Sequence, residues 1–339
     1  MLYVGLDVSV ARTAVCLMDA AGQVLREQSV ASTPEAIAAM IGASGKEVQR
    51  VGLEAGGNSA WIARGLLQAK LPVIVIDPTH AAAALKTGFR NKTDKNDARG
   101  IADLMRVNKF RAVAVKSVSA QRDRALLTVR EQLRRQSLDA RNIIWSILQV
   151  EGLKPPKLVS PAFQVLVTES LNDEALAPLL QPLVAVVEHL DCQVAALDKV
   201  IAQRAKASIV CKRLMTVPGV GPLVALTYVA GVDDPARFSD SRTVGAHFGL
   251  TPRRFQSGEM DWSGGITRAG DAGVRRALYQ AANVLIHHSR GWCALKSWAV
   301  RLAKRRGLGR AKVALARKLA VVLHKMWTAD QDYRLKAQA

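Results

Sequence analysis

The order of short apolar segments near the start of the chain limits its fold more than any other feature. Three segments rich in β-branched residues come first, with a turn sequence between the second and third. They predict an antiparallel meander of strands at residues 2–9, 12–18 and 23–29. A helix after Thr33 and Pro34 follows, and then a strand, a helix and a buried strand at residues 48–53, 59–69 and 72–76. The chain therefore begins with a mixed α/β domain.

Three strands followed by alternating helices and strands is the order of ribonuclease-H-like domains, and it places the first strand in the middle of the sheet. The same order would suit one half of an actin-like ATPase. Such an ATPase would need a second, repeated half with its own glycine-rich phosphate loop, and the sequence contains no such repeat. We therefore expect a ribonuclease-H-like domain.

Four acidic residues in this region are spaced like the ligands of a divalent metal ion. Asp7 and Glu54 each end an apolar strand segment, whereas Asp94 and Asp97 are three residues apart and share one face of a predicted helix. The chain has 48 Lys and Arg against 28 Asp and Glu, and a bound cation explains why so basic a chain places carboxylates inside apolar segments. Each residue alone could equally be a solvated side chain or a helix cap. Together they indicate metal-assisted phosphoryl chemistry on nucleic acid, with Mg²⁺ or Mn²⁺ as the cofactor.

The formal net charge of +20 and the pI near 10.3 indicate a polyanionic partner, because excess positive charge serves mainly to neutralise phosphates. Residues 1–110 hold 13 basic and 10 acidic side chains, which leaves 35 and 18 for residues 111–339. The carboxylates and the polyanion-binding surface thus belong to different parts of the chain. An anionic membrane surface is the rival partner, but the sequence has no run of about 18 apolar residues and no signal-peptide pattern. We expect a cytoplasmic, nucleoid-associated protein with no membrane contact.

The cysteines are far apart and show no C-x-x-C spacing, which argues against a zinc knuckle and against a disulfide framework. We expect all four to be buried thiols: Cys16, Cys192, Cys211 and Cys293.

Two long helices are expected at residues 117–150 and 174–208, with a break at residues 152–156 that turns the chain into an antiparallel hairpin. The first helix carries arginines, Arg130 and Arg134 among them, between regularly spaced leucines and isoleucines. Its basic face is interpreted as a nucleic-acid track or a dimer stalk, with a solvated surface as the alternative.

Residues 214–222 are similar to a helix-hairpin-helix motif. In such a motif Gly219 and Gly221 would let the turn close and leave backbone N–H groups free for phosphate at a helix N-terminus. A plain tight turn between two helices is the alternative.

Two further basic segments are candidate phosphate-binding sites. A glycine-rich loop expected between residues 248 and 271 combines N–H donors with Arg253, Arg254 and Arg268 ahead of a helix. The helical tail has nine Lys or Arg and no acid between residues 301 and 325, and its candidate phosphate contacts are Lys304, Arg305 and Lys312.

Six short motifs occur in order along the chain: Gly5-Leu6-Asp7-Val8-Ser9, Leu53-Glu54-Ala55, Lys92-Thr93-Asp94-Lys95-Asn96-Asp97-Ala98, Val217-Pro218-Gly219-Val220-Gly221, Ser257-Gly258 and Gly265-Ile266-Thr267-Arg268-Ala269-Gly270. Together they resemble the DEDD transposases of bacterial insertion sequences, in the insertion-sequence one-ten family, which is related to the Piv DNA invertases. The likeness covers nearly the whole chain. Each motif is weak alone, but six in the right order are not expected by chance.

The resemblance implies a RuvC-like catalytic domain of ribonuclease-H fold at residues 1–112 and a helical coiled coil at residues 113–208. A mainly α C-terminal transposase domain with the helix-hairpin-helix-like motif would follow at residues 209–327, and a tail at residues 328–339. It also implies that Ser257 is the nucleophile and that the metal-binding catalytic tetrad is Asp7, Glu54, Asp94 and Asp97. Ser263 is the competing candidate for the nucleophile.

Attack by Ser257 would form a phosphoserine link that conserves the energy of the broken bond, so strands could be exchanged without ATP. No histidine lies beside this serine in the sequence, so its activation would have to come from the metal or from nearby arginines. The resemblance further implies a composite site in a dimer or tetramer, double-stranded DNA of element ends and target as substrate, and a structured noncoding RNA as a guide.

Two other functions suit the same residues. A Holliday-junction or other structure-specific endonuclease would use the tetrad with water as nucleophile and would form no protein–DNA adduct. A non-catalytic basic nucleic-acid-binding protein would carry structural carboxylates, and substitution of Asp7 would then remove no metal binding.

Overall fold

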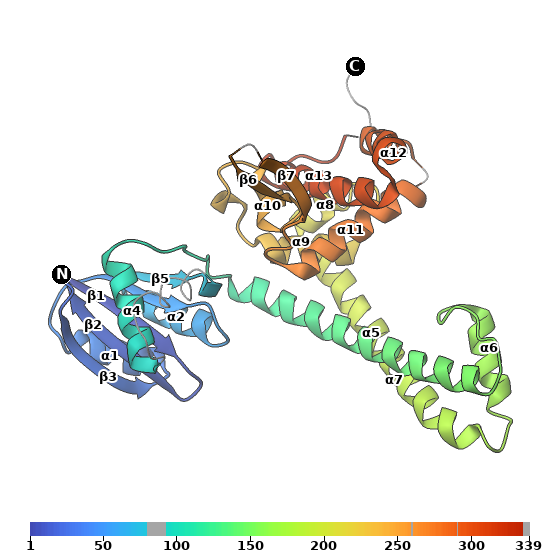
Figure 1. Ribbon diagram of the computed structural model, residues 1–339, viewed down its shortest axis with the longest axis horizontal. Helices are drawn as coiled ribbons and strands as arrows, with labels where there is room; N and C mark the ends of the chain where they lie inside the picture. The colour runs from blue at the N-terminus through green and yellow to red at the C-terminus, as the bar shows by residue number, and fades with distance from the viewer. Residues whose placement is uncertain (80–92, 259, 290, 335–339) are drawn as a thin grey trace. The chain divides into compact units, whose positions relative to one another are not determined.

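The first part of the chain is built on a five-stranded sheet in the order β3-β2-β1-β4-β5 (Figure 1). β1, β2 and β3 form the antiparallel meander predicted from the sequence, whereas β4 pairs in parallel with β1 and β5 in parallel with β4. β1 therefore lies in the middle of the sheet. The strands are Leu2–Val8 (β1), Arg12–Asp19 (β2), Val24–Ala31 (β3), Val48–Glu54 (β4) and Val73–Ile76 (β5).

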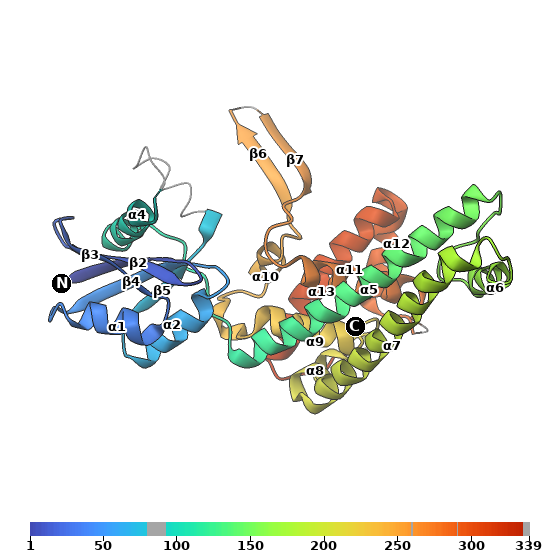
Figure 2. The same cartoon turned by 90° about the horizontal axis from the view of Figure 1, so that it is seen from below.

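Side chains alternate along the strands, so the sheet has two faces that must be covered. α1 (Pro34–Gly42) and α2 (Ser59–Gln68) pack on one face around Leu6 and Leu53. α4 (Asp94–Arg106) covers the opposite face, as Figure 2 shows. The sheet is thus the middle layer of three.

α4 meets the sheet at two glycines that lie opposite each other in β1 and β4, Gly5 and Gly52. A Cβ atom on Gly5 would overlap the carbonyl oxygen of Ala98 and the backbone nitrogen of Ala102, whereas one on Gly52 would meet only the side chains of Ile101 and Met105. The backbone of α4 therefore rests directly on the backbone of β1, and only glycine fits at position 5.

The computed structural model describes residues 1–79, 93–258, 260–289 and 291–334, and the chain divides into two compact units after Lys116. In the second unit α5 (Val118–Val150) and α7 (Ala177–Ala207) form the expected antiparallel hairpin (Figure 1). α6 (Pro161–Ser170), which the sequence reading missed, shares a core with both at the tip of this hairpin. The hydroxyl of Ser160 accepts from the backbone nitrogen of Phe163 and caps α6.

The rest of the second unit is mainly helical and shares one core with the end of α7, where Ile201 and Ala205 are buried. The boundary expected near residue 208 lies inside this unit. Beyond the last helix, Asp330 and Asp332 pair with Arg213 at 2.5 and 3.8 Å. The remaining elements are α8 (Ile209–Leu214), α9 (Pro222–Val232), η1 (Pro235–Arg237), α10 (Thr243–His247), β6 (Pro252–Ser257), β7 (Met260–Ile266), α11 (Ala272–His287), α12 (Ala294–Arg306) and α13 (Leu308–Thr328).

The cysteine prediction was wrong for one residue. Cys16, Cys211 and Cys293 are buried free thiols, but Cys192 is exposed on α7, because the hairpin helices bury only a narrow stripe of side chains. No helix within the described ranges is both long and apolar enough to cross a lipid bilayer.

Candidate active site and nucleic-acid interface

Asp7 and Glu54 lie at the carboxyl ends of two neighbouring parallel strands. β1 and β4 pair with Leu6 opposite Leu53, so the two acidic residues occupy the next position on each strand. Asp7 is two residues after Gly5, and Glu54 is two residues after Gly52. Since every second residue of a strand points the same way, both carboxylates belong to the sheet face that α4 covers. Both side chains are half-buried. The sheet thus places these two carboxylates at one edge and on one face.

Asp94 and Asp97 lie in the first turn of α4, where the hydroxyl of Thr93 accepts from the backbone nitrogen of Asn96 at 3.2 Å. The positive end of the helix dipole stabilises carboxylates at this position. Later residues of α4 pack near Tyr3, at the start of β1, whereas Ala98 lies on Gly5. The first turn of α4 therefore points toward the end of β1 that carries Asp7. Lys92 of this motif lies outside the described residues.

The four carboxylates do not form one closed metal-binding site in the structure. In the parts of the chain that the structure describes, no three His, Cys, Asp or Glu side chains lie close enough to hold a metal ion together. Asp7 and Glu54 each have an interaction partner of their own. Mg²⁺ is usually bound by one or two carboxylates together with substrate phosphates, so the donor chemistry of this edge suits that ion.

An ion pair that was not predicted from the sequence holds α4 to strand β3. The guanidinium of Arg99 binds the carboxylate of Glu27 on β3, with Nη2 donating to Oε2 at 2.7 Å, and the hydrogen bond from Arg99 lowers the pKa of Glu27. Next to it, burial and then the charge of Glu27 raise the pKa of the Cys16 thiol to about 12. The partners are 72 residues apart, so no local pattern predicts the pair. It helps to hold the helix that carries Asp94 and Asp97.

The glycine-rich loop expected at residues 248–271 is largely a β-hairpin, so the loop prediction was wrong for residues 252–266. β6 and β7 pair antiparallel, with Ser257 opposite Met260 and Arg254 opposite Ser263. The turn passes through Gly258, whose φ of +55° suits glycine. Apolar residues alternate with polar ones across the turn, and cross-strand packing of these side chains outweighs the loop tendency of the glycines. Figure 2 shows the hairpin projecting from the helices of its unit.

The two candidate serines lie on opposite faces of this hairpin. Ser257 shares a face with its partner Met260 and with Phe255 and Trp262, because directly paired residues and every second residue point the same way. Ser263 belongs to the other face, where Arg254 binds Asp261 through two hydrogen bonds of 2.9 and 2.6 Å. Both serines are exposed. They therefore present their hydroxyls to different surroundings.

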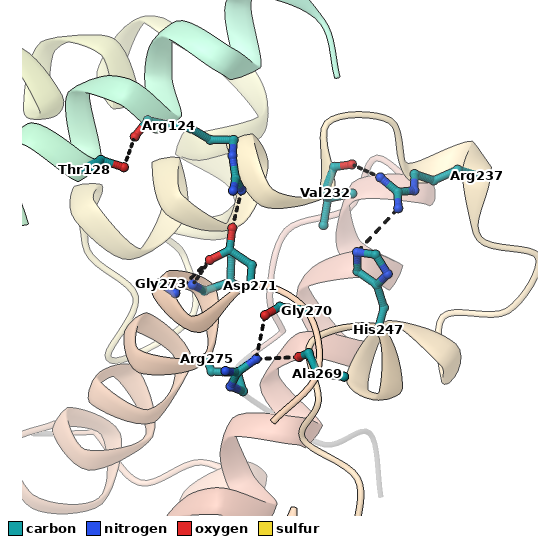
Figure 3. A network of polar contacts seen from close by, with 11 residues as sticks. Arg124, Thr128, Val232, Arg237, His247, Ala269, Gly270, Asp271, Gly273 and Arg275 are labelled. Atoms are coloured by element: carbon teal, nitrogen blue, oxygen red, sulfur yellow. Dashed lines mark hydrogen bonds and ion pairs between the residues drawn. The ribbon is translucent and has the colours of Figure 1, made fainter. Parts of the chain in front are cut away.

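The other arginines of this segment differ in whether their side chains are held by hydrogen bonds or exposed to solvent. Arg253 is exposed and donates weakly to the carbonyl of Thr267 at 3.4 Å. Arg268 is exposed too, with a left-handed φ of +58°, and its backbone nitrogen donates to Gly249. The side chain of Arg275, by contrast, donates to the carbonyls of Ala269 and Gly270 (Figure 3). It also donates to the carbonyl of Phe248. Arg275 therefore shapes the loop, whereas Arg253 and Arg268 face solvent.

A cavity of about 570 Å³ lies between α5, α9 and α11. Its charged lining is dominated by arginine, with Glu131 and Asp271 as the acidic members. Glu131 receives two hydrogen bonds from Arg134, at 3.0 and 3.2 Å, and is 3.5 Å from Arg276. The hydrogen bond from Arg134 lowers the pKa of Glu131. We call this cavity the arginine groove; its arginines are Arg124, Arg130, Arg134, Arg135 and Arg276.

The arginines of the long hairpin are used largely within the molecule. Arg130 is mostly buried and donates to Asp198 on α7 at 2.9 and 3.1 Å. Arg141 pairs in the same way with Asp191, and Arg204 with Asp123. Arg130 therefore ties α5 to α7, whereas Arg134 lies on the open side of the helix.

The glycines of the helix-hairpin-helix-like segment have different surroundings. Gly219 has a φ of +87°, and a Cβ atom there would lie 2.6 Å from the carbonyl oxygen of Ala281 on α11. This glycine allows the turn between α8 and α9 to pack on α11. Gly221 forms the N-cap of α9, and a Cβ atom there would meet no atom within 4 Å. Of the two, Gly221 is the one at an accessible helix N-terminus.

The basic tail contains two helices separated by Gly307, whose φ is +83°. Lys304 and Arg305 are exposed in the last turn of α12, and Lys312 is half-buried in the first part of α13. These cations belong to the same compact unit as the arginine groove and the hairpin. Candidate phosphate contacts are thus distributed over several elements of the second unit.

Two family models match the chain. A DEDD model of IS110 elements, described as a transposase, matches residues 4–151, and a model described as the transposase IS116/IS110/IS902 family matches residues 211–297. The transposase for insertion sequence element IS1111A of Coxiella burnetii is 31% identical over 288 residues, which cover 83% of this chain and 78% of that protein. A "probable family 20 transposase" of Pseudomonas aeruginosa is 27% identical over 84% of this chain and 85% of its own length. The transposase for IS1328 of Yersinia enterocolitica is 27% identical over 69% and 70%.

Proposed function

The chain belongs to the IS116/IS110/IS902 family of DEDD transposases, enzymes that act on DNA, and we propose that it cuts and rejoins the DNA of an insertion sequence through a phosphoserine intermediate at Ser257. The observation that supports the proposal is that Asp7 and Glu54 end two neighbouring parallel strands on the sheet face covered by α4, the helix that carries Asp94 and Asp97 in its first turn. The strand order of that sheet, with Asp7 on its central strand, supports a ribonuclease-H-like, RuvC-like domain for this unit.

We assign the metal to Asp7, Glu54, Asp94 and Asp97, whose oxygens suit Mg²⁺ or Mn²⁺. When bound there, the ion polarises the scissile phosphate and stabilises its developing negative charge. The half-buried Asp7 and Glu54 would be held in place by the sheet, and Asp94 and Asp97 by the backbone contact of α4 with Gly5. Binding of the ion together with a DNA phosphate would still have to bring these carboxylates closer to one another.

Ser257 would attack the phosphorus with its Oγ atom. The new Oγ–P bond replaces one P–O bond of the strand, the serine proton leaves to a base or solvent, and the oxygen of the released strand end takes up a proton to become a hydroxyl. Attack by a second strand end reverses these changes and frees the serine, so no ATP is consumed. Arg253 and Arg268 lie at the base of the hairpin, several residues from its turn, and Arg254 is engaged with Asp261, so the phosphate oxyanion at Ser257 would be stabilised by the metal ion. Ser257 is favoured over Ser263 because it lies beside the turn at the end of the projecting hairpin.

The second unit would hold the nucleic acid. Arg134, Gly221, Lys304, Arg305 and Lys312 are accessible to different degrees on several elements, and we propose that they contact phosphates of element and target DNA. A structured RNA guide is proposed as an additional partner, and the excess of basic over acidic side chains in residues 111–339 is compatible with it. Since Ser257 and the carboxylates belong to different units, the reaction needs both units, either within one chain or between the chains of a homo-oligomer.

Trapping of the covalent intermediate tests the proposal. Full-length protein is incubated with Mg²⁺, element-end DNA and the flanking noncoding transcript, and denaturing gels are scored for a protein–DNA adduct. The adduct should form with wild type and with Ser263→Ala, and should be absent with Ser257→Ala and with Asp7→Ala.

Other outcomes separate the remaining possibilities. Mg²⁺-dependent cutting without an adduct, unchanged by Ser257→Ala, would reject the serine mechanism and favour a structure-specific nuclease that uses water. An adduct that forms equally without the transcript would reject the RNA guide while retaining the serine mechanism.

A further inference from the structure

Two large aromatic side chains are exposed on the projecting hairpin. The rings of Phe255 on β6 and Trp262 on β7 stack with centroids 4.4 Å apart and planes inclined by 18°. The two residues nevertheless remain 47% and 56% exposed. Met260, on the same face, is 68% exposed. This face of the hairpin is therefore an apolar surface in contact with solvent.

Stacking of Phe255 on Trp262 across the two strands explains why the rings touch each other, but it does not explain why both remain exposed to solvent. A cross-strand aromatic pair stabilises a two-stranded hairpin, which would be marginal alone. However, all six residues of β6 are exposed, so no other part of the described chain covers this strand. Exposed aromatic side chains that group on one face are typical of a binding surface.

The strand beside the pair leaves space for a ligand. Trp262 is followed by Gly264 on the same face, where a Cβ atom would lie 3.2 Å from the indole ring. Glycines inside a strand weaken it and often mark a place where a ligand approaches closely. Gly264 therefore gives the indole room to lie along the strand, and the ring still keeps 56% of its surface exposed to a planar group.

We propose that Phe255 and Trp262 form a platform on which an unpaired DNA base stacks. The charge of the region favours nucleic acid as the occupant, because residues 111–339 hold 35 basic against 18 acidic side chains and Arg253 lies exposed next to the pair. Bases of an intact duplex are already stacked on their neighbours, so the platform takes a base that is flipped or lies at a melted or cut position. Such stacking is tolerant of sequence, since every base has a π-face.

The platform lies beside the proposed nucleophile. Ser257 is two residues from Phe255 on the same face, roughly 7 Å along the strand. A base held by the aromatic pair therefore keeps a neighbouring phosphate close to the serine hydroxyl. For this positioning role the inference depends on the proposed function of Ser257, whereas base binding itself does not.

Binding of single strands with and without bases tests the platform. Full-length protein is titrated with a fluorescent 20-residue oligothymidylate and with a 20-residue abasic deoxyribose-phosphate of equal charge. The ratio of the two affinities isolates stacking from phosphate contact. In Phe255→Leu and Trp262→Leu the ratio should fall by a factor of about 5 to 100, the effect of losing one stacked base, with abasic binding unchanged.

Two variants complete the design. Trp262→Phe keeps a ring and should restore most of the ratio. Trp292→Leu removes an equally exposed tryptophan outside the hairpin, at 67% exposure, and should leave the ratio at the wild-type value. An unchanged ratio in both platform variants, or an equal fall for both probes, would overturn the proposal. A change of oligomeric state without any change of the ratio would instead identify the face as a protein contact and would equally reject base stacking.

The test is independent of the proposed reaction. Ser257→Ala should retain the wild-type ratio of affinities. The wild-type protein could form no covalent adduct with DNA while the ratio of affinities still falls in Phe255→Leu or Trp262→Leu. In that case the serine mechanism is wrong, and base stacking on the aromatic pair is still supported. Crosslinking of 5-iodouracil in the strand should then still label Phe255 or Trp262.

Discussion

Asp271 joins the start of α11 to Arg124 on α5 through one carboxylate. Its Oδ1 accepts from the backbone nitrogens of Gly273 and Val274 at 2.7 and 3.1 Å, and its Oδ2 binds the guanidinium of Arg124 (Figure 3). Burial acts to raise the pKa of Asp271, but the charge of Arg124 and these hydrogen bonds outweigh it, and the pKa lies below its ordinary value. This carboxylate therefore caps one helix and fixes another.

Loss of the Asp271 charge should lower stability in a pH-dependent way. Because the pKa is lower in the folded than in the unfolded protein, the stabilisation is present above about pH 4 and is lost as the pH falls further. We expect Asp271→Asn to lower the free energy of unfolding by about 1–2 kcal/mol at pH 7, and by less below pH 4. Urea titrations between pH 2.5 and 7 measure the difference, with Asp139→Asn on the exposed side of α5 as the control. A penalty that stays constant over this range would contradict the assignment.

Gly219 and Gly221 should respond differently to the same substitution. Gly219→Ala puts a Cβ atom against α11 at a positive φ, and we expect a loss of about 2–3 kcal/mol in unfolding free energy. Gly221→Ala meets open space and should change stability by less than about 0.5 kcal/mol. Thermal unfolding of both proteins decides this. Equal effects would mean that the turn does not pack on α11 as described.

The substitution Gly5→Ala should disturb the proposed metal site, although Gly5 is not one of its ligands. The added methyl group must push α4 from β1, which we expect to cost about 3 kcal/mol and to displace Asp94 and Asp97. Adduct formation should fall at least tenfold at a temperature where the protein is still folded. Gly57→Ala, with no atom within 4 Å of the new methyl group, is the matched control. A stable and fully active Gly5→Ala would refute the close contact.

Binding of Mg²⁺ should appear as stabilisation that depends on Asp7. At a concentration ten times the dissociation constant, a bound ion adds about 1.4 kcal/mol to the free energy of unfolding. Differential scanning fluorimetry across a Mg²⁺ series should show this shift in wild type and in Asp103→Asn, which removes a carboxylate from the last part of the same helix. Asp7→Asn should show a much smaller shift. Identical shifts in all three would exclude Asp7 as a ligand.

Cations of the arginine groove should contribute to the salt dependence of DNA binding. Each lost phosphate contact lowers the slope of log Kobs against log salt by about 0.9. We therefore expect Arg134→Gln and Arg276→Gln each to reduce the slope by about that amount for a non-specific duplex. Arg26→Gln removes an exposed charge from β3 and should leave the slope unchanged. Slopes that match wild type in both groove variants would place the phosphate contacts elsewhere.

The parts of the fold that depend on local patterns were predictable. The apolar alternation of β1 to β3, and the Thr33 cap with its following proline, are local, and their elements form where expected. The middle position of β1 was expected from the order of the elements, whereas the register that brings Asp7 beside Glu54 is known from the structure. The helical hairpin was recognised from its leucine spacing and its proline break.

Features that depend on contacts between distant residues were not predictable. The basic face of α5 was interpreted as a nucleic-acid track or a dimer stalk, but the partner of Arg130 is Asp198, which lies 68 residues away in sequence. The segment at residues 252–266 was predicted to be a loop because of its glycines. The cross-strand stacking of Phe255 on Trp262 forms only in the folded hairpin and is not a local sequence pattern. The roles of Ser257 and of the four carboxylates stay predictions.

The contacts of Glu131 have a consequence for how the arginine groove receives a ligand. Its carboxylate restricts Arg134 through two hydrogen bonds and approaches Arg276 and Arg130 at 3.5 and 3.9 Å. Long arginine side chains lose much rotamer freedom when a ligand fixes them, and here that freedom is already reduced by folding. An incoming phosphate would replace one anion by another around guanidiniums that are already ordered. The predicted binding of phosphate in the groove would therefore be an exchange of counter-ions, in which little conformational entropy remains to be lost.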